Sequence, residues 1–276
     1  MNVAKLRVWN WFAGLLHLTQ AIIMWFLVDS IVLDVVWRRF GPVIPEGMDP
    51  QDVQPEAIQG LQPTATEFMG WEIEVGLLLV AFLAMSAIAH LLISTVLFDS
   101  YIENLRAGKN PYRWIEYSVS ASTMIVAIAL LTGINDIGTL GAIFALTAVM
   151  NLMGWVMEEM NDVSGDGVLE MRDLNWRPFW IGSFAGAVPW VIILGSIWGT
   201  RQDFEAFPDF VVYVSIVTFV LFNIFAVNMW LQYKEVGPWS DYIFGEKMYI
   251  VLSLVAKSTL AWWVYTGAQG TELIAV

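Results

Sequence analysis

Long apolar stretches recur along this chain. Six of them contain no Asp, Glu, Lys or Arg, and a seventh contains a single charge, Lys257. A transmembrane helix needs roughly 20 predominantly apolar residues, and only helices or closed barrels satisfy the backbone in lipid. The pattern therefore predicts an all-α membrane protein, a seven-helix bundle that forms one domain over residues 1–276. The predicted spans are residues 8–33, 72–98, 111–134, 137–158, 177–200, 209–233 and 246–269.

The first apolar stretch also has a feature of signal peptides, because Lys5 and Arg7 precede it. Signal peptides end in a cleavage site of small residues. Here His17 and Gln20 interrupt the apolar stretch and no such site follows. We therefore expect this segment to remain in the mature chain as the first span.

The composition supports a multi-pass protein of the cell membrane, surrounded by lipid. Hydrophobic residues make up 58% of the chain and charged residues only 14%, whereas soluble domains average about 45–50% and about 25%. The net charge of −13 argues against a nucleic-acid partner, which would require a basic patch. An acidic surface of this kind suggests a halophilic microbe. The chain has no cysteine, so disulfide and thiolate chemistry are excluded.

The basic residues are distributed unequally between the two sides of the predicted bundle. Nine of the 13 Lys and Arg flank the spans on the side of the N-terminus, and three, Arg38, Arg39 and Arg201, lie on the other. The positive-inside rule then places the N-terminus in the cytoplasm and the C-terminus outside. The long first loop, residues 35–71, is expected to be extracellular. Its start, VLDVVWRRFGPVIP, is rich enough in Val and Ile to form short β-strands.

Lys257 is the feature of the last span that requires an explanation. An ionisable residue at membrane depth is costly and is by default a functional-site hypothesis whose partner must be found. Glu116 is the best candidate for that partner. Asn110 and Pro111 form a typical helix start, which places Glu116 more than one turn inside the third span.

Four ionisable residues from four different spans fall in one layer of the membrane. A rise of 1.5 Å per residue places Lys257 and His17 at about 15 Å from the cytoplasmic end, His90 at about 12 Å and Glu116 at about 10 Å. Ser86, one turn from His90, falls at about 18 Å on the same scale. The sequence therefore predicts one buried polar cluster.

Two classes of explanation remain open for this cluster. Lys257 and Glu116 could form a structural ion pair, or Glu116 could be solvated at the headgroup level, and each histidine could be an ordinary hydrogen-bonding residue. Alternatively, a desolvated lysine can attack a carbonyl to form a Schiff base. Retinal is an aldehyde that suits an apolar seven-helix interior, a carboxylate would serve as counter-ion, and a histidine could take up a proton.

Four short motifs, together with the inverted topology, resemble the heliorhodopsins, a family of microbial rhodopsins. They are SLVAK, which ends at Lys257, EYSVSAS, which begins at Glu116, HLTQ in the first span and SAIAH in the second. The resemblance covers essentially the whole chain. It implies all-trans retinal attached to Lys257 as a protonated Schiff base, with Glu116 as the counter-ion.

The resemblance implies further roles. Ser253 and Ser86 would hydrogen-bond around the ion pair, and His17, Gln20 and His90 would belong to a proton-accepting polar cavity. It also implies a homodimeric light sensor with an unknown signalling partner, and not an enzyme. Spans three to seven also offer residues able to line a polyene pocket: Tyr117, Ser120, Met124, Asn151, Trp190, Trp230 and Trp262.

The sequence also bears on transport. Pumps with an acid in the third span usually carry a second carboxylate seven residues away, but Thr123 and Lys109 occupy those positions here. We expect no other carboxylate deep inside a span, and the absence of a second station favours a sensor over a proton relay. A light-driven or light-gated proton or ion transporter remains the alternative function. A pigment-free transporter with a structural Lys–Glu pair is a third possibility.

One acidic segment, DVSGDGVLEMRD over residues 162–173, resembles a calcium-binding loop. The candidate ligands are Asp162, Ser164, Asp166, Glu170 and Asp173, with Gly167 at the turn position. The last ligand is usually a bidentate Glu, and a shorter Asp occupies that position here. We therefore interpret the segment as an acidic glycine-rich turn and predict no metal site.

Overall fold

The computed structural model describes residues 3–28, 32–43, 61–161, 174–203 and 207–269. These ranges contain eight α-helices, one 3-10 helix and two strands. In chain order they are α1 (Val3–Leu27), β1 (Val32–Pro42), β2 (Leu61–Glu74), α2 (Val75–Ser94), α3 (Phe98–Arg106), α4 (Pro111–Leu131), α5 (Ile137–Met160), α6 (Arg177–Asp203), α7 (Asp209–Tyr233), η3 (Gly237–Ser240) and α8 (Tyr242–Gln269).

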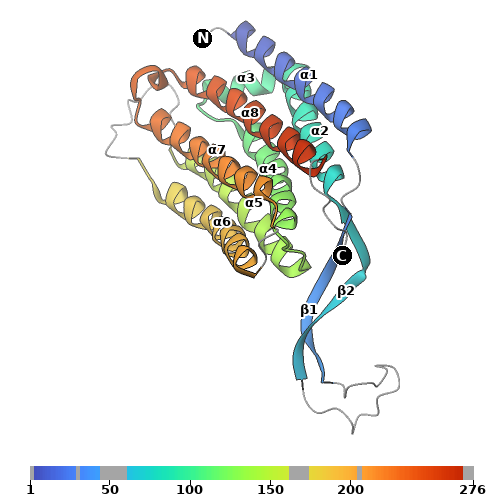
Figure 1. Ribbon diagram of the computed structural model, residues 1–276. Helices are drawn as coiled ribbons and strands as arrows, with labels where there is room; N and C mark the ends of the chain where they lie inside the picture. Colours follow the sequence, from blue (N-terminus) through green and yellow to red (C-terminus); the bar gives the residue numbers. More distant parts are fainter. Residues whose placement is uncertain (1–2, 29–31, 44–60, 162–173, 204–206, 270–276) are drawn as a thin grey trace.

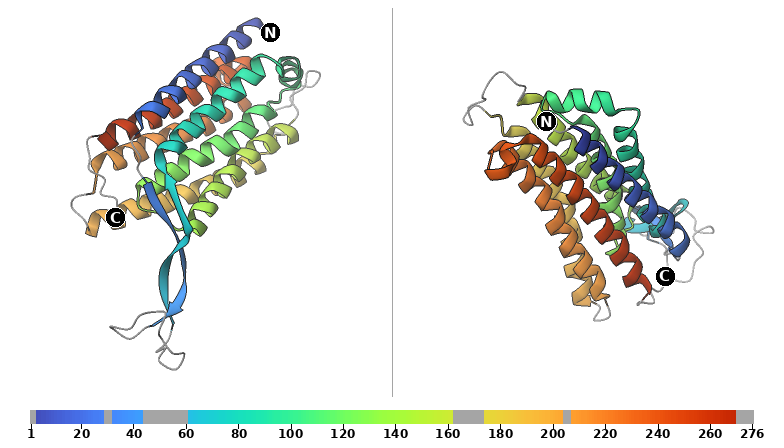
Figure 2. Two further views of the ribbon diagram at one scale, coloured as in Figure 1. Left: turned by 90° about the vertical axis from the view of Figure 1, so that its right-hand side faces the viewer. Right: turned by 90° about the horizontal axis from the view of Figure 1, so that it is seen from above.

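Seven of these helices, all except α3, are long and apolar enough to cross a membrane. They lie roughly parallel in one bundle, and consecutive helices pack against each other (Figures 1 and 2). Helix α4 is the most enclosed of the seven, because 72% of the residues in its most apolar stretch are buried. All seven of these helices contribute side chains to the main apolar core, which includes Met24, Leu83, Ile128 and Leu260. The prediction of a seven-helix bundle is confirmed.

The start of α4 is the one that positions the site. Asn110 caps this helix by accepting a hydrogen bond from the backbone nitrogen of Arg113 at 3.2 Å, and Pro111 occupies its first turn. The sequence predicted this helix start, because an Asn cap satisfies a free N–H group and Pro has no N–H to satisfy. Glu116 therefore lies more than one turn inside the helix, as expected.

Several span ends differ from the sequence prediction. The first span was predicted to reach residue 33, but α1 ends at Leu27 and β1 already begins at Val32. The second was predicted over 72–98, but residues 72–74 belong to β2 and the helix ends at Ser94. A count of apolar residues does not distinguish a strand from a helix, because both accept Val, Ile and Trp. The last helix begins at Tyr242, one turn before the predicted residue 246.

Helix α3 was not predicted from the sequence. This short helix follows a turn after α2, and its buried face carries Tyr101, Ile102 and Leu105. These side chains pack against residues of α1 and α8, including Leu6 and Ile250. Its other face is charged, so no long apolar run marks it in the sequence.

The first loop contains a β-hairpin, in agreement with the predicted strands. β1 and β2 are antiparallel, with Val32 opposite Glu74 and Pro42 opposite Leu61. The strands of 11 and 14 residues are longer than expected, and the hairpin projects away from one end of the bundle (Figures 1 and 2). We call this the hairpin end, and the opposite end, where α1 begins, the N-terminal end.

The base of the hairpin is attached to the turn between α4 and α5. The backbone nitrogen of Val36 donates to the carbonyl oxygen of Asn135 at 3.0 Å. The Asn135 side chain donates to the Asp34 carbonyl at 3.0 Å, and the Arg38 backbone nitrogen donates to the Asp136 carboxylate at 3.1 Å. These polar contacts fix the base of the hairpin to the bundle, and Leu33 and Ile73 of the two strands also pack against the apolar core.

Candidate functional site: a buried lysine and glutamate

The centre of the site is an ion pair between α8 and α4. The side-chain nitrogen of Lys257 lies 2.7 Å from Glu116 Oε1. It also donates to the hydroxyl oxygens of Ser86 at 2.5 Å and Ser253 at 3.2 Å. Ser86 in turn donates to the same Glu116 oxygen at 2.5 Å. The Lys257 side chain is 3% exposed and that of Glu116 is 10% exposed, so this pair is enclosed by protein.

Helical spacing explains why these four side chains meet. Ser253 precedes Lys257 by four residues on α8, so the two share one face of the helix. Ser86 projects from α2, which packs against α4. The sequence had placed Lys257, Glu116 and Ser86 in one layer from depth alone, and the structure brings them into direct contact.

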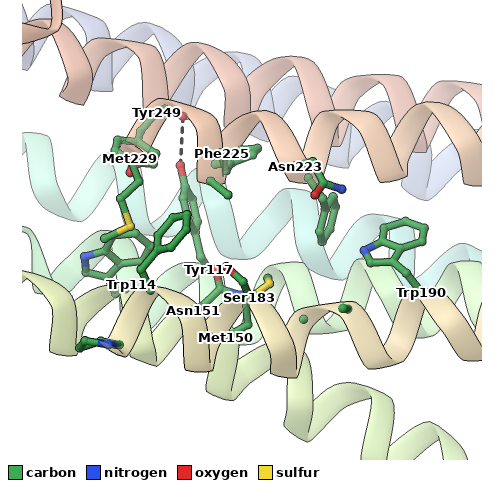
Figure 3. Close-up of a pocket in the computed structure, with 18 of the residues that line it drawn as sticks. Trp114, Tyr117, Met150, Asn151, Ser183, Trp190, Asn223, Phe225, Met229 and Tyr249 are labelled. Atoms are coloured by element: carbon green, nitrogen blue, oxygen red, sulfur yellow. Dashed lines mark hydrogen bonds between the residues drawn. The ribbon is translucent and has the colours of Figure 1, made fainter. Parts of the chain in front are cut away.

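Lys257 opens onto an apolar cavity. The cavity next to Lys257 has a volume of about 40 Å³ and adjoins one of about 240 Å³ between α4, α5, α6 and α7. Tyr117, Met150, Asn151, Phe222 and Phe225 line both. Figure 3 shows the larger cavity extending from Trp114 and Met229 at one end to Trp190 at the other. The two volumes together form an aromatic slot that begins at the lysine.

Glycines of α6 create part of this space. A Cβ atom on Gly182 would lie 2.9 Å from the Met153 Cβ and 3.2 Å from the Met150 carbonyl oxygen. A Cβ atom on Gly186 would overlap the sulfur of Met150. Close approach of α5 and α6 therefore depends on glycine at these two positions, and Met150 fills the wall opposite them.

The structure separates the predicted pocket-wall residues into two groups. Tyr117, Met124, Asn151 and Trp190 line the two cavities. Three others line neither cavity. Ser120 is buried one turn after Glu116, Trp230 is 43% exposed on α7, and Trp262 donates to the Gln20 side chain at 3.0 Å. An aromatic residue in a membrane helix often faces lipid or another helix, and the sequence offered no means to distinguish these positions.

The two histidines lie together between α1 and α2. Their rings stack with centroids 5.9 Å apart and planes within 10°. His17 is fully buried, and neither of its ring nitrogens has a hydrogen-bond partner within the part of the chain that the structure describes. His90 Nδ1 lies 2.8 Å from the side-chain oxygen of Asn10. Both rings are near enough to Lys257 to interact with its charge.

A second buried ionic cluster, which was not predicted from the sequence, joins α4, α5 and α8. Arg113 of α4 forms short ion pairs with Glu158 of α5 and Glu246 of α8, and all three side chains are at most 5% exposed. Asn110 completes the cluster. Its backbone nitrogen donates to Glu158 at 2.8 Å and its side chain donates to Glu246 at 2.7 Å. The Arg113 guanidinium lies 3.8 Å above the centre of the Tyr249 ring.

This cluster corrects one sequence-based argument. No carboxylate other than Glu116 was expected deep inside a span, and a buried carboxylate at a helix end was not considered. Glu158 and Glu246 belong to the terminal turns of their helices, yet they are 2% and 1% exposed. The helix ends converge at the N-terminal end of the bundle and bury these charges. The sequence held one sign of this cluster: Arg113 lies one turn before Glu116 on the same predicted helix, and a buried Arg requires carboxylate partners.

Tyr101 of α3 lies next to this cluster. Burial, helped by the negative charge of Glu246, raises the pKa of the Tyr101 hydroxyl well above its usual value. Tyr101 therefore remains a neutral hydroxyl, and it lies next to the Asn10 side chain. Asn10 thus contacts both Tyr101 and His90.

The acidic segment 162–173, with Asp162, Ser164, Asp166, Glu170 and Asp173, lies outside the described residues. Elsewhere in the described ranges, no group of three or more His, Cys, Asp or Glu is arranged to hold a metal ion.

The site fits an apolar aldehyde. A buried primary amine can form a covalent bond with a carbonyl carbon, its carboxylate neighbour can balance the resulting charge, and the aromatic slot can hold a hydrocarbon chain. Fold and site together define a retinal-binding seven-helix membrane protein of the microbial rhodopsin class. The sequence model of the heliorhodopsin family matches residues 6–269. The chain belongs to the heliorhodopsin family, and membership implies a retinal chromophore.

Solved structures support the fold. A light-driven proton pump from Leptosphaeria maculans matches with a TM-score of 0.62 and 12% identity, covering 98% of both chains. A thermophilic rhodopsin from Rubrobacter xylanophilus matches with a TM-score of 0.59 and 15% identity, covering 96% of both chains. At this identity the likeness concerns the fold alone. A search of curated proteins found no match.

Proposed function

We propose that this protein is a light sensor in which all-trans retinal is bound to Lys257 as a protonated Schiff base, with Glu116 as the counter-ion. The observation that carries the proposal is the buried Lys257 nitrogen, 2.7 Å from Glu116 and at the wall of the aromatic cavity. Bound retinal supplies the light-absorbing polyene whose isomerisation starts the response. The remaining functions belong to side chains of the chain itself.

Glu116 balances the positive charge at the Lys257 nitrogen, and two hydroxyls fix the position of both partners. Ser253 accepts a hydrogen bond from the nitrogen, while Ser86 contacts the nitrogen and the carboxylate together. The apolar walls at Tyr117 and Phe225 exclude water, which strengthens the interaction of the two charges. The pocket therefore keeps a proton at the lysine nitrogen in the dark.

The histidines provide a place for that proton after illumination. His17 and His90 lie close enough to Lys257 to interact with its charge, and the free nitrogen of a neutral imidazole can accept a proton. Gln20 supports this region by accepting from Trp262 Nε1 at 3.0 Å. We propose that this polar region, His17, Gln20 and His90, holds the proton transiently and returns it to the lysine nitrogen.

We also propose a cytoplasmic N-terminus, an extracellular hairpin end and a homodimer that acts through a signalling partner. The excess of Lys and Arg at the N-terminal end supports this orientation. Membership of the heliorhodopsin family supports a sensor, with lipid around the bundle and no role for nucleic acid.

Light-driven or light-gated ion transport is the second candidate function. The cluster of Arg113, Glu158 and Glu246 favours it, because a vectorial relay needs a second ionisable station between the lysine and the aqueous phase. Illumination of the protein in sealed vesicles distinguishes the two functions. A sensor produces no sustained change of pH or current, whereas a transporter produces at least one of them.

The test of retinal attachment is a visible absorption spectrum of protein purified with all-trans retinal, recorded beside Lys257→Ala. We expect a visible band in the wild type and none in the variant. A band that persists in Lys257→Ala would contradict attachment at this residue. Lys247→Ala, which alters a lysine in the first turns of the same helix, is the matched control and should keep the band.

A further inference from the structure

Asn10 on α1 makes two hydrogen bonds that together define its orientation. It is 2% exposed. Its side-chain nitrogen lies 3.0 Å from the backbone carbonyl oxygen of Leu6, one turn earlier. A carbonyl oxygen only accepts hydrogen bonds, so the amide nitrogen of Asn10 must face Leu6. The amide oxygen then faces His90, 2.8 Å from its Nδ1.

This orientation determines which nitrogen of His90 carries a proton. An amide oxygen cannot donate, so the hydrogen bond between Asn10 and His90 exists only when Nδ1 bears the hydrogen. A doubly protonated ring would need a second acceptor at Nε2. Within the described residues, no hydrogen bond involves that nitrogen. The contact therefore fits the neutral ring with hydrogen on Nδ1.

We infer that Asn10 is a positioning residue that holds His90 in the Nδ1–H tautomer and so leaves Nε2 as its proton-accepting nitrogen. The inference rests on the proposed function, in which His90 accepts a proton. The hydrogen bond made by one imidazole nitrogen commonly sets the role of the other. Charged and titratable groups that face His90 come from three other helices: His17 on α1, Glu116 on α4 and Lys257 on α8.

His17 differs from His90 in this respect. Neither of its nitrogens has a described partner, so no hydrogen bond selects between its two tautomers. The two stacked rings therefore have distinct roles. His90 is the ring whose acceptor atom is fixed before light arrives, and His17 provides an unpaired neighbour.

Nitrogen NMR tests the inference directly, because His17 and His90 are the only two histidines. Protein loaded with retinal in lipid nanodiscs and labelled with ¹⁵N-histidine gives four ring-nitrogen signals, which His17→Phe assigns to the two rings. We expect a protonated Nδ1 and an unprotonated Nε2 on His90. In Asn10→Leu the Nδ1–H signal should be lost in part or whole in favour of Nε2–H. In Asn10→Asp, which keeps an acceptor oxygen, Nδ1 should stay protonated.

Asn104→Leu is the matched control, because Asn104 makes the same kind of bond to the Ser100 carbonyl but contacts no histidine. A wild-type His90 with hydrogen on Nε2 would overturn the inference, as would an Asn10→Leu spectrum identical to the wild type. The wild-type spectrum decides even where a variant fails to fold. A visible spectrum of the same sample separates the two ideas. An absent band contradicts the proposed function, whereas a normal band with the wrong tautomer contradicts only the role of Asn10.

Discussion

The side-chain nitrogen of Lys257 and a carboxylate oxygen of Glu116 lie 2.7 Å apart inside the bundle, although 141 residues separate them in the chain. Two unlike charges withdrawn from water are costly unless they are paired and hydrogen-bonded. Ser86 and Ser253 supply those hydrogen bonds. Removal of one charge alone is therefore expected to destabilise the protein more than removal of both charges.

Glu116→Gln leaves the Lys257 charge buried without its partner. Removal of one member of a buried pair typically costs about 3–5 kcal/mol, so the retinal-free variant should unfold at a clearly lower temperature in detergent. Glu116→Gln with Lys257→Met removes both charges and should recover much of the loss. Glu103→Gln, at an exposed position of α3, is the control. A double variant that is no more stable than Glu116→Gln would contradict the predicted recovery.

Arg113→Met leaves two buried carboxylates facing each other. Glu158 and Glu246 would then lose their shared cation, and the free energy of unfolding should fall by about 3–5 kcal/mol. Additional Glu158→Gln and Glu246→Gln substitutions should restore part of this loss. Thermal unfolding of each retinal-free variant measures these changes in stability.

Lys109→Met provides the comparison for Arg113→Met. Lys109 pairs with Glu159, whose side chain is 49% exposed, and an exposed pair contributes about 0–1 kcal/mol. If Arg113→Met cost no more than Lys109→Met, the buried cluster would not contribute to stability.

Several features of this molecule could be predicted from the sequence because their signals are local. Apolar runs marked the seven helices, and Asn110 with Pro111 marked the start of α4. Depth along the helices was sufficient to place Lys257 and Glu116 in one layer. The charged cluster around Arg113 was not predictable in this way. A charge in the terminal turn of a single helix resembles an interfacial residue, and burial arises only when the ends of α4, α5 and α8 converge.

The same limit applies to the pocket and to the hairpin. Trp190 and Trp230 are equivalent in the sequence, yet the first lines the cavity and the second faces outward. The rotation of each helix about its axis decides which tryptophan faces the cavity. The spans are apolar on nearly all faces, so the sequence does not indicate that rotation. Residues 72–74 were assigned to a helix because strand and helix share apolar composition.

Gly186→Ala should reduce retinal binding. The new methyl group would overlap the Met150 sulfur, and Met150 lines both cavities, so its displacement narrows the slot. We expect a lower yield of pigment or a shifted visible band. Gly195→Ala on the same helix meets no atom within 4 Å and should bind retinal normally. Unchanged absorption in Gly186→Ala would show that Met150 moves away from the slot.

The attachment of the hairpin should depend on pH through Asp136. Burial opposes ionisation of this carboxyl, but hydrogen bonds from the backbone and side chain of Thr139 and the backbone of Arg38 outweigh it and hold the pKa below its usual value. A lowered pKa in the folded state stabilises the contact above the ordinary aspartate pKa of about 3.9. That stabilisation is lost as the pH falls through the lower, folded-state pKa.

Amide hydrogen exchange at Val36 and Arg38 reports this change, because both backbone nitrogens donate to the turn that contains Asp136. Exchange, corrected for its intrinsic pH dependence, should accelerate below the folded-state pKa in the wild type. Asp136→Asn lacks the carboxylate, so its corrected exchange should be faster at neutral pH and flat across the acid range. Asp99→Asn, at an exposed position of α3, should follow the wild type. A flat wild-type profile would mean that the ionised carboxylate does not hold the hairpin to the bundle.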